Sequence, residues 1–215
     1  MACSLTFKYK PGQLSKDVDM ILTFGTPPKD TSRSFAAWHI AKLKSIPDSV
    51  AVNEFNVKYS GKLGFSVAQV DTRNIITSGS MVEVKPGQAT DLTLSGSEPS
   101  WSVPSGTSGE LVRATNKTGL KQNIAFGIVE EGKGGYNTLS PTFVFQDVED
   151  TKNIEVAFKP ILKIYVSYDF KENDFFTGGL VSDEPIWTGN LAALAPAAKL
   201  AFAEEAEGEY RVNAL

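Results

Sequence analysis

The chain has 215 residues, a net charge of -4, and 41% hydrophobic and 21% charged residues, which predicts a globular protein with a sizeable buried core. No run of Lys or Arg is present, which argues against a surface that tracks the phosphates of nucleic acid or anionic lipid. One cysteine, Cys3, excludes an intrachain disulfide, and one histidine, His39, excludes zinc sites built on several His ligands.

Two further absences bear on location. The N-terminal residues contain no apolar stretch of signal-peptide length, and no run of about 18 apolar residues could span a bilayer. We therefore expect a soluble, cytoplasmic protein. The sequence leaves the oligomeric state open.

Short runs with alternating apolar residues recur along the whole chain, separated by clusters of Gly, Pro, Asn, Asp and Ser. This spacing predicts an all-β, sandwich-like fold with little helix. The runs lie at residues 5–9, 19–24, 35–43, 54–60, 64–70, 80–85, 90–94, 110–115, 123–129, 142–148, 153–158 and 161–170.

Several segments between the runs predict turns. The tetrapeptide KPGQ occurs at residues 10–13 and 85–88, each time just after a strand-like run, and Pro followed by Gly favours a tight turn. The sequence GKGGYN at residues 132–137 superficially suggests a phosphate loop. It lacks the Lys-Ser/Thr ending and a following helix, so we interpret it as a hairpin loop.

A second pass of the same pattern is indicated, because Ser-Glu-Pro-Ser-Trp at residues 97–101 is matched by Asp-Glu-Pro-Ile-Trp at residues 183–187. A looser relative, Ser-Phe-Ala-Ala-Trp, lies at residues 34–38. Residues 59–92 also parallel residues 117–154, with drifting offsets, although chance similarity of β sequence competes with duplication. We predict two related antiparallel sandwich-like halves, residues 1–95 and 96–215, that meet near residues 94–101.

The C-terminal segment, residues 191–215, is the only one with helix-forming composition. Pro196 interrupts a continuous helix, whereas Leu200, Phe202, Tyr210 and Val212 share one parity around a Glu-Gly turn. We therefore favour a hairpin preceded by a short helical turn at residues 191–195. An Ala-rich helix over residues 196–205 is the alternative.

Nothing in the sequence favours an enzyme. His39 lies beside Trp38 in a strand-like run with no nucleophile elbow nearby, which favours a structural imidazole over a catalytic base. Carboxylates cluster at residues 147–150, 169–174 and 183–184, but no spacing matches an EF-hand, and we interpret them as solvated turns. No catalytic residue is predicted, and a metal site stays undetermined.

The aromatic residues are the better candidates for binding. Trp38, Trp101 and Trp187 recur near loop-to-strand boundaries, where an indole can stack on a sugar, a pigment ring or a lipid head group. Each could instead plug the end of its own sandwich core. If a ligand site exists, we expect it at Trp38, His39, Trp101 and Trp187, with Trp38 and Trp101 facing a shared cleft between the halves.

The segments at residues 110–128 and 186–215, together with the lack of signal and disulfides, resemble small soluble proteins of mushroom fruiting bodies. Among these, the chain most resembles the pink chromoproteins of oyster mushrooms, which are non-enzymatic carriers of a coloured small molecule. The resemblance implies a bound conjugated organic chromophore, with or without a metal ion. It transfers no binding residue, because no motif is shared.

Two classes of function remain from the sequence. One is a small-molecule carrier, which needs an enclosed apolar pocket. The other is a lectin-like or lipid-binding defence protein, which needs shallow exposed sites. The residues alone do not choose between them.

Overall fold

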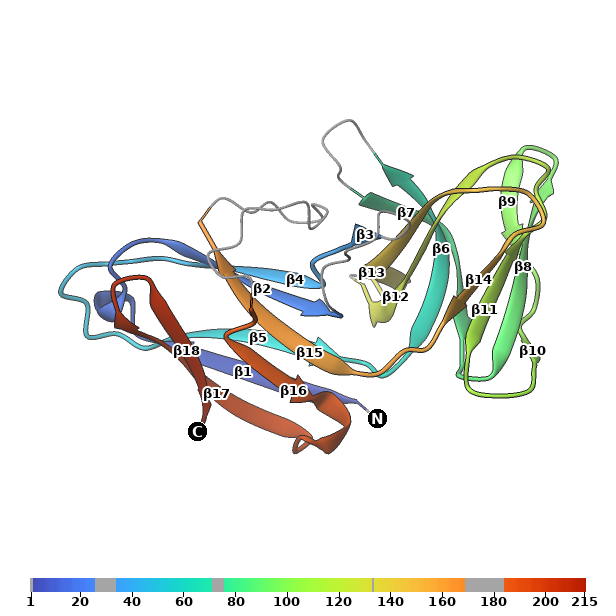
Figure 1. Ribbon diagram of the computed structural model, residues 1–215. Helices are drawn as coiled ribbons and strands as arrows, with labels where there is room; N and C mark the ends of the chain where they lie inside the picture. Colours follow the sequence, from blue (N-terminus) through green and yellow to red (C-terminus); the bar gives the residue numbers. More distant parts are fainter. Residues whose placement is uncertain (1, 26–33, 71–75, 133, 169–183) are drawn as a thin grey trace.

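A computed structural model describes residues 2–25, 34–70, 76–132, 134–168 and 184–215 (Figure 1). Within these ranges the chain forms eighteen strands in four sheets and two short 3-10 helices. The prediction of an all-β, sandwich-like fold with little helix is confirmed. No helix in the described ranges is long and apolar enough to cross a membrane.

Two of the sheets form a sandwich that we call lobe 1, drawn mainly in blue and red in Figure 1. One sheet has the order β18 (Glu209–Ala214), β17 (Ala197–Ala206), β1 (Cys3–Tyr9) and β5 (Asn53–Tyr59). The facing sheet has the order β16 (Trp187–Asn190), β15 (Ile161–Ser167), β2 (Val18–Phe24) and β4 (His39–Leu43). Lobe 1 is thus built from both ends of the chain.

The other two sheets form lobe 2, drawn mainly in green and yellow. One has the order β3 (Ser34–Phe35), β13 (Asn137–Val148), β12 (Gln122–Glu131), β6 (Leu63–Val70) and β7 (Ile76–Val84). The facing sheet has the order β10 (Ser105–Gly106), β8 (Gln88–Ser95), β11 (Val112–Asn116) and β14 (Asn153–Val156), and β9 (Glu98–Trp101) also pairs with β8.

The predicted division at residues 95 and 96 does not describe how the strands pair. Every one of the four sheets contains strands from both predicted halves; β1 pairs with β17, β2 with β15, β6 with β12 and β8 with β11. Alternating hydrophobicity shows which face of a strand is buried but not which strand lies beside it, so the boundary could not be read from the pattern. Lobe 2 is formed by the central segment together with β3, and lobe 1 by the other strands of the two flanking segments.

The two lobes nevertheless share one strand arrangement. The strands of lobe 1 can be taken in the order β15–β18, β1, β2, β4, β5, and those of lobe 2 in the order β6–β9, β11–β14. Each pairing between strands of the first series then has its counterpart in the second. In particular, the parallel pair β17–β1 corresponds to the parallel pair β8–β11, and the antiparallel pair β15–β2 corresponds to β6–β12. Lobe 1 is therefore a circular permutation of lobe 2. The repeat predicted from residues 59–92 and 117–154 does not correspond to this relation. It aligned β6 with β12, which are neighbours in one sheet and not equivalent strands of the two lobes.

A continuous core runs through both lobes. In β1, every second residue is buried, whereas β2 is buried along its whole length. A path of ring contacts crosses from one lobe to the other, with centroid separations of 4.9 Å for Trp38–Phe24, 5.4 Å for Phe24–Phe158, 5.7 Å for Phe158–Phe126, 5.2 Å for Phe126–Phe65 and 6.1 Å for Phe65–Trp101. Phe158, in the linker between β14 and β15, joins the two halves of this path.

The segment between β3 and β4 joins the lobes a second time. Ala36 is buried on the outer face of the lobe 2 sheet, Ala37 on the outer face of the lobe 1 sheet, and Trp38 in the continuous core. The backbone N–H of Ala36 donates to Thr142 in lobe 2, and that of Trp38 donates to Leu22 in lobe 1. Three successive side chains thus occupy three buried clusters, which holds the lobes in one relative position.

The predicted turns are confirmed. KPGQ at residues 10–13 forms helix η1 (Pro11–Gln13), its second copy forms the turn between β7 and β8, and residues 132–136 connect the antiparallel strands β12 and β13. The C-terminal segment contains helix η2 (Leu191–Ala193) and the hairpin of β17 and β18. Leu200, Phe202 and Val212 are buried on one face of this hairpin, as their shared parity predicted.

Candidate functional site

A cleft with a volume of about 910 Å³ lies between the two lobes. One wall comes from lobe 1 and contains His39, at the start of β4, and residues 56–58 of β5. The other comes from lobe 2 and contains residues 129–131 of β12 and the glycines of the β12–β13 turn. Clefts of this size at the junction of two lobes are common ligand sites.

Two side chains from different lobes, His39 and Glu130, meet in this cleft. The imidazole Nε2 of His39 lies 3.2 Å from Oε1 of Glu130. The indole Nε1–H of Trp38 donates to the same oxygen over 2.9 Å. The side chains of His39 and Glu130 are about one-quarter exposed, with values of 26% and 22%. Both groups can therefore contact a ligand while they hold each other in place.

The surroundings of Glu130 keep it ionised. Burial of this carboxyl group would raise its pKa, but the hydrogen bond and the charge of His39 oppose that effect. Hydrogen bonds from Ser140 and Trp38 act in the same direction, and the net result is a pKa below the ordinary value for glutamate. The cleft thus contains a fixed carboxylate beside an imidazole.

Two hydrogen bonds join the linker between β5 and β6 to strand β12 beside the cleft. The hydroxyl of Ser60, in the linker between β5 and β6, donates to the carbonyl of Val129 over 2.6 Å. The N–H of Val129 donates in turn to the carbonyl of Lys62 over 3.0 Å. These two bonds hold the two walls of the cleft together where the linker lies against β12.

The remaining lining groups are polar. Lys58 is exposed on β5, and the Lys62 ammonium lies 3.6 Å from a carboxylate oxygen of Glu83. The carbonyl oxygen of the Asn56 side chain accepts from Thr6 over 2.7 Å, and Asn137 starts β13 at the opposite rim. These groups can bind carboxylate, carbonyl or hydroxyl substituents of a small molecule, with His39 at the centre.

Trp38, one of the tryptophans predicted to bind a ligand, is a core residue. It is only 4% exposed, and its ring contacts those of Phe24, His39 and Tyr59. It therefore cannot stack on a ligand, although its Nε1–H helps to position Glu130 at the cleft. His39 is the predicted binding residue that lines the cleft.

Trp101 and Trp187 lie elsewhere. Trp101, on β9, stacks on Phe65 and donates its Nε1–H to the carbonyl of Ser80, which places it at the edge of lobe 2. Trp187, on β16, packs over Gly189, where an added methyl group would collide with the indole. Among the described residues no tryptophan ring contacts another, and neither Trp101 nor Trp187 lines the cleft. The expected cleft shared by Trp38 and Trp101 is not formed, because β4 and β9 are not equivalent strands in the two lobes.

Sequence reasoning missed Glu130 and Lys58. Glu130 directly follows the apolar run at residues 123–129, and a carboxylate at the end of a buried strand is a signal that could have singled it out. Lys58 has no comparable signal, because it is one of many polar residues on an alternating strand.

A metal site does not fit the described residues. No group of three or more His, Cys, Asp or Glu side chains lies together in those ranges, and His39 with Glu130 provides only two ligands. The predicted carboxylate cluster at residues 169–174 and Asp183 lie outside the described residues. Among the described residues, the imidazole of His39 is paired with a carboxylate and with no hydroxyl or thiol group that it could activate.

Comparisons with known proteins add no identification: no protein-family model, curated protein or solved structure is significantly similar to this chain.

Proposed function

We propose that the protein is a non-enzymatic binder of a small conjugated molecule, which it holds in the cleft between the lobes. The observation that carries this proposal is the pairing of His39 with Glu130 across the cleft of about 910 Å³ between the lobes. The resemblance to the pink chromoproteins of oyster-mushroom fruiting bodies supports a coloured ligand. Location in the cytoplasm is part of the same proposal.

The walls are polar, unlike the enclosed apolar pocket expected of a carrier, and their chemistry favours a polar ligand over a purely apolar one. A conjugated ring system with carboxylate or carbonyl substituents would accept from Lys58 and Asn137 at the rim. The imidazole of His39 would contact the ring system, since its plane is held by Glu130. Because hydrogen bonds already hold the two walls of the cleft together before binding, little conformational entropy is lost when the ligand enters.

The first experiment is an absorption spectrum of the protein purified from its natural source and dialysed extensively. We expect visible absorbance that stays with the protein and is released on denaturation. The released compound, recombined with the recombinant chain, should restore the colour. His39→Gln should weaken this recombination, and Val103→Ala, at an exposed loop position of lobe 2, should leave it unchanged.

Two results would separate the parts of the proposal. A dialysed protein without visible absorbance would contradict the chromophore. A coloured protein in which His39→Gln and Lys58→Ala both recombine like the unaltered chain would place the ligand outside this cleft.

A lipid-binding role is the second candidate, and one loop of lobe 1 favours it. The connection between β4 and β5 exposes Ile46, Val50 and Val52, of which Val50 is 96% exposed. Aliphatic side chains at a loop tip can enter the interfacial region of a bilayer. Sedimentation with vesicles of neutral phosphatidylcholine tests this role. Binding that Val50→Glu abolishes would support it.

A further inference from the structure

The two lobes differ at one equivalent edge, where the last strand of the hairpin approaches the facing sheet. In lobe 2 this strand is β9, and Trp101 closes the edge by packing on Phe65 of β6 and donating to Ser80 of β7. In lobe 1 the corresponding strands are β18, β15 and β16. No tryptophan lies on β18, and the edge remains open as a pocket of about 310 Å³.

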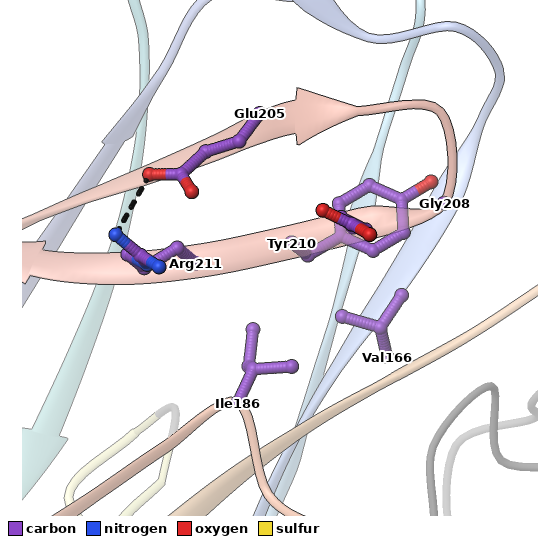
Figure 2. Close-up of a pocket in the computed structure, with 7 residues that line it drawn as sticks. Val166, Ile186, Glu205, Gly208, Tyr210 and Arg211 are labelled. Atoms are coloured by element: carbon purple, nitrogen blue, oxygen red, sulfur yellow. Dashed lines mark ion pairs between the residues drawn. The ribbon is translucent and has the colours of Figure 1, made fainter.

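Figure 2 shows how this pocket is built. Val166 of β15 and Ile186, just before β16, approach the hairpin from one side and form an apolar floor. The hairpin of β17 and β18 provides Glu205, the ring of Tyr210 and Arg211 on the other side. Apolar and charged groups thus face each other across a space suited to a ligand of about one ring.

The hairpin has a β-bulge at the pocket. The register between β17 and β18 shifts between Glu204 and Ala206, so that Glu205 is the additional residue. The equivalent hairpin of β8 and β9 keeps its register throughout. A bulge redirects a side chain, and Glu205 here meets Arg211, whose Nη1 lies 3.1 Å from Oε1. The polar side of the pocket is therefore specific to lobe 1.

Hydrogen bonds to Glu204 fix the turn end of the hairpin. Both carboxylate oxygens of Glu204 accept hydrogen bonds from Ser15, and one of them also accepts from the N–H of Gly208. Glu204 is thus occupied by the fold. Glu205, Glu209 and the remaining N–H groups of Arg211 are the charged groups that can meet a ligand.

These charges favour a neutral ligand. An anion would meet two carboxylates beside one guanidinium. A cation could pair with Glu209 but would leave the N–H donors of Arg211 unused. A neutral polyol can donate hydroxyl hydrogens to Glu205 and Glu209 and accept from the remaining N–H groups of Arg211, without breaking the ion pair. We propose that the pocket binds a single sugar ring, whose apolar face packs on Val166, Ile186 and Tyr210. This site is separate from the cleft between the lobes.

The test is saturation-transfer NMR of the full chain with D-glucose, D-galactose, D-mannose and N-acetyl-D-glucosamine. We expect at least one of these sugars to bind weakly. Arg211→Gln should weaken that binding by about tenfold, the effect of one charge-assisted hydrogen bond. Arg113→Gln is the matched control, because Arg113 also pairs with a glutamate on a neighbouring strand, Glu155, but lies in lobe 2. It should leave sugar binding unchanged.

Glu205→Gln provides a second variant that keeps the size of the side chain, and it should also weaken binding. The proposal is overturned if none of the four sugars gives a signal at concentrations up to about 0.1 M. It is also overturned if both pocket variants bind like the Arg113→Gln control, or if choline or acetate competes better than the sugars.

Discussion

The two lobes have the same strand arrangement but close their edges differently. Lobe 2 places Trp101 between β9 and the facing sheet, and its β8–β9 hairpin is regular. Lobe 1 has a bulged β17–β18 hairpin at the equivalent edge, and a pocket lies where the other lobe is closed. Strand order thus defines the scaffold, whereas a few residues at its edges decide where a pocket forms.

The joint between the lobes shows the same division of roles. Trp38 and Phe158 belong to the core and fix how the lobes meet, while His39 and Glu130 at the rim of that joint face the cleft. A substitution in the core should therefore affect stability first. A substitution at the rim should affect binding first.

Loss of Trp38 should have the largest effect on stability, because its indole is buried in the core where the two lobes meet. Trp38→Ala removes a buried indole and the hydrogen bond that Glu130 accepts from it. We expect the free energy of unfolding to fall by about 3–5 kcal/mol. Urea denaturation followed by circular dichroism measures it, with Val103→Ala as a fully folded control. A loss of less than about 1 kcal/mol would show that the indole is not a core element.

Opening the closed edge of lobe 2 should have the next largest effect. Trp101→Ala would remove the partly buried ring from Phe65 and leave an opening like that of lobe 1. We expect a loss of about 2–3 kcal/mol, below the range for fully buried tryptophans. Trp101→Phe removes chiefly the hydrogen bond to Ser80 and should cost about 1 kcal/mol. Equal losses for the two variants would contradict a packing role.

The central strands of the lobes differ at a glycine. Strand β12 contains Gly127, opposite Gly64, whereas β2 has no glycine. A methyl group at Gly127 would collide with the carbonyl oxygen of Ser140, next to the point where the register of β12 and β13 shifts. We expect Gly127→Ala to cost about 1–3 kcal/mol.

Gly106→Ala is the matched control for Gly127→Ala, because nothing lies within 4 Å of the added group there. Its effect should stay within about 0.5 kcal/mol. If thermal unfolding detects no difference between the two variants, the backbones of β12 and β13 are less closely packed than the structure indicates.

The sequence predicted the local structure better than the arrangement of the strands. Alternating runs identified most of the strands, although β9, β10 and β16 lie outside every predicted run. The parity of Leu200, Phe202 and Val212 correctly favoured a hairpin over the alternative of an Ala-rich helix. These signals are local, since period two and turn residues act within a few positions. Which strands pair depends on contacts between distant segments, and the pairing of β1 with β17 has no local signature.

The candidate site was predictable only in part. His39 drew attention because it is the single histidine, but its partner Glu130 lies 91 positions further along the chain and is brought near by the fold. The tryptophans were predicted as stacking surfaces, and Trp38 instead packs in the core. In sequence, a bulky aromatic residue at the end of a strand fits a ligand-stacking role and a core-packing role equally well. Only its burial in the folded structure separates the two roles.

The smallest expected effect concerns the charge of Glu130. Burial alone would raise the pKa of this carboxyl group, but the hydrogen bond and charge of His39, together with the hydrogen bonds from Ser140 and Trp38, outweigh burial, so the pKa is lowered in the folded protein. A carboxyl group with a lowered folded-state pKa stabilises the protein above its ordinary pKa of 4.5, and this contribution disappears as the pH falls through the folded-state value. The unfolding free energies of the unaltered chain and of Glu130→Gln should therefore converge as the pH falls below 4.5.

The convergence can be measured by urea denaturation at a series of pH values. Glu155→Gln is the appropriate control, because Glu155 pairs with Arg113 on an exposed surface of lobe 2, where solvent screens the interaction. Its difference from the unaltered chain should be small, about 0–1 kcal/mol. A difference for Glu130→Gln that is independent of pH would mean that the hydrogen bonds of this side chain, rather than its charge, hold the rim of the cleft together. In that case the amide that Glu130→Gln introduces would not reproduce those hydrogen bonds. The charge interaction with His39 would then add nothing to the free energy of unfolding.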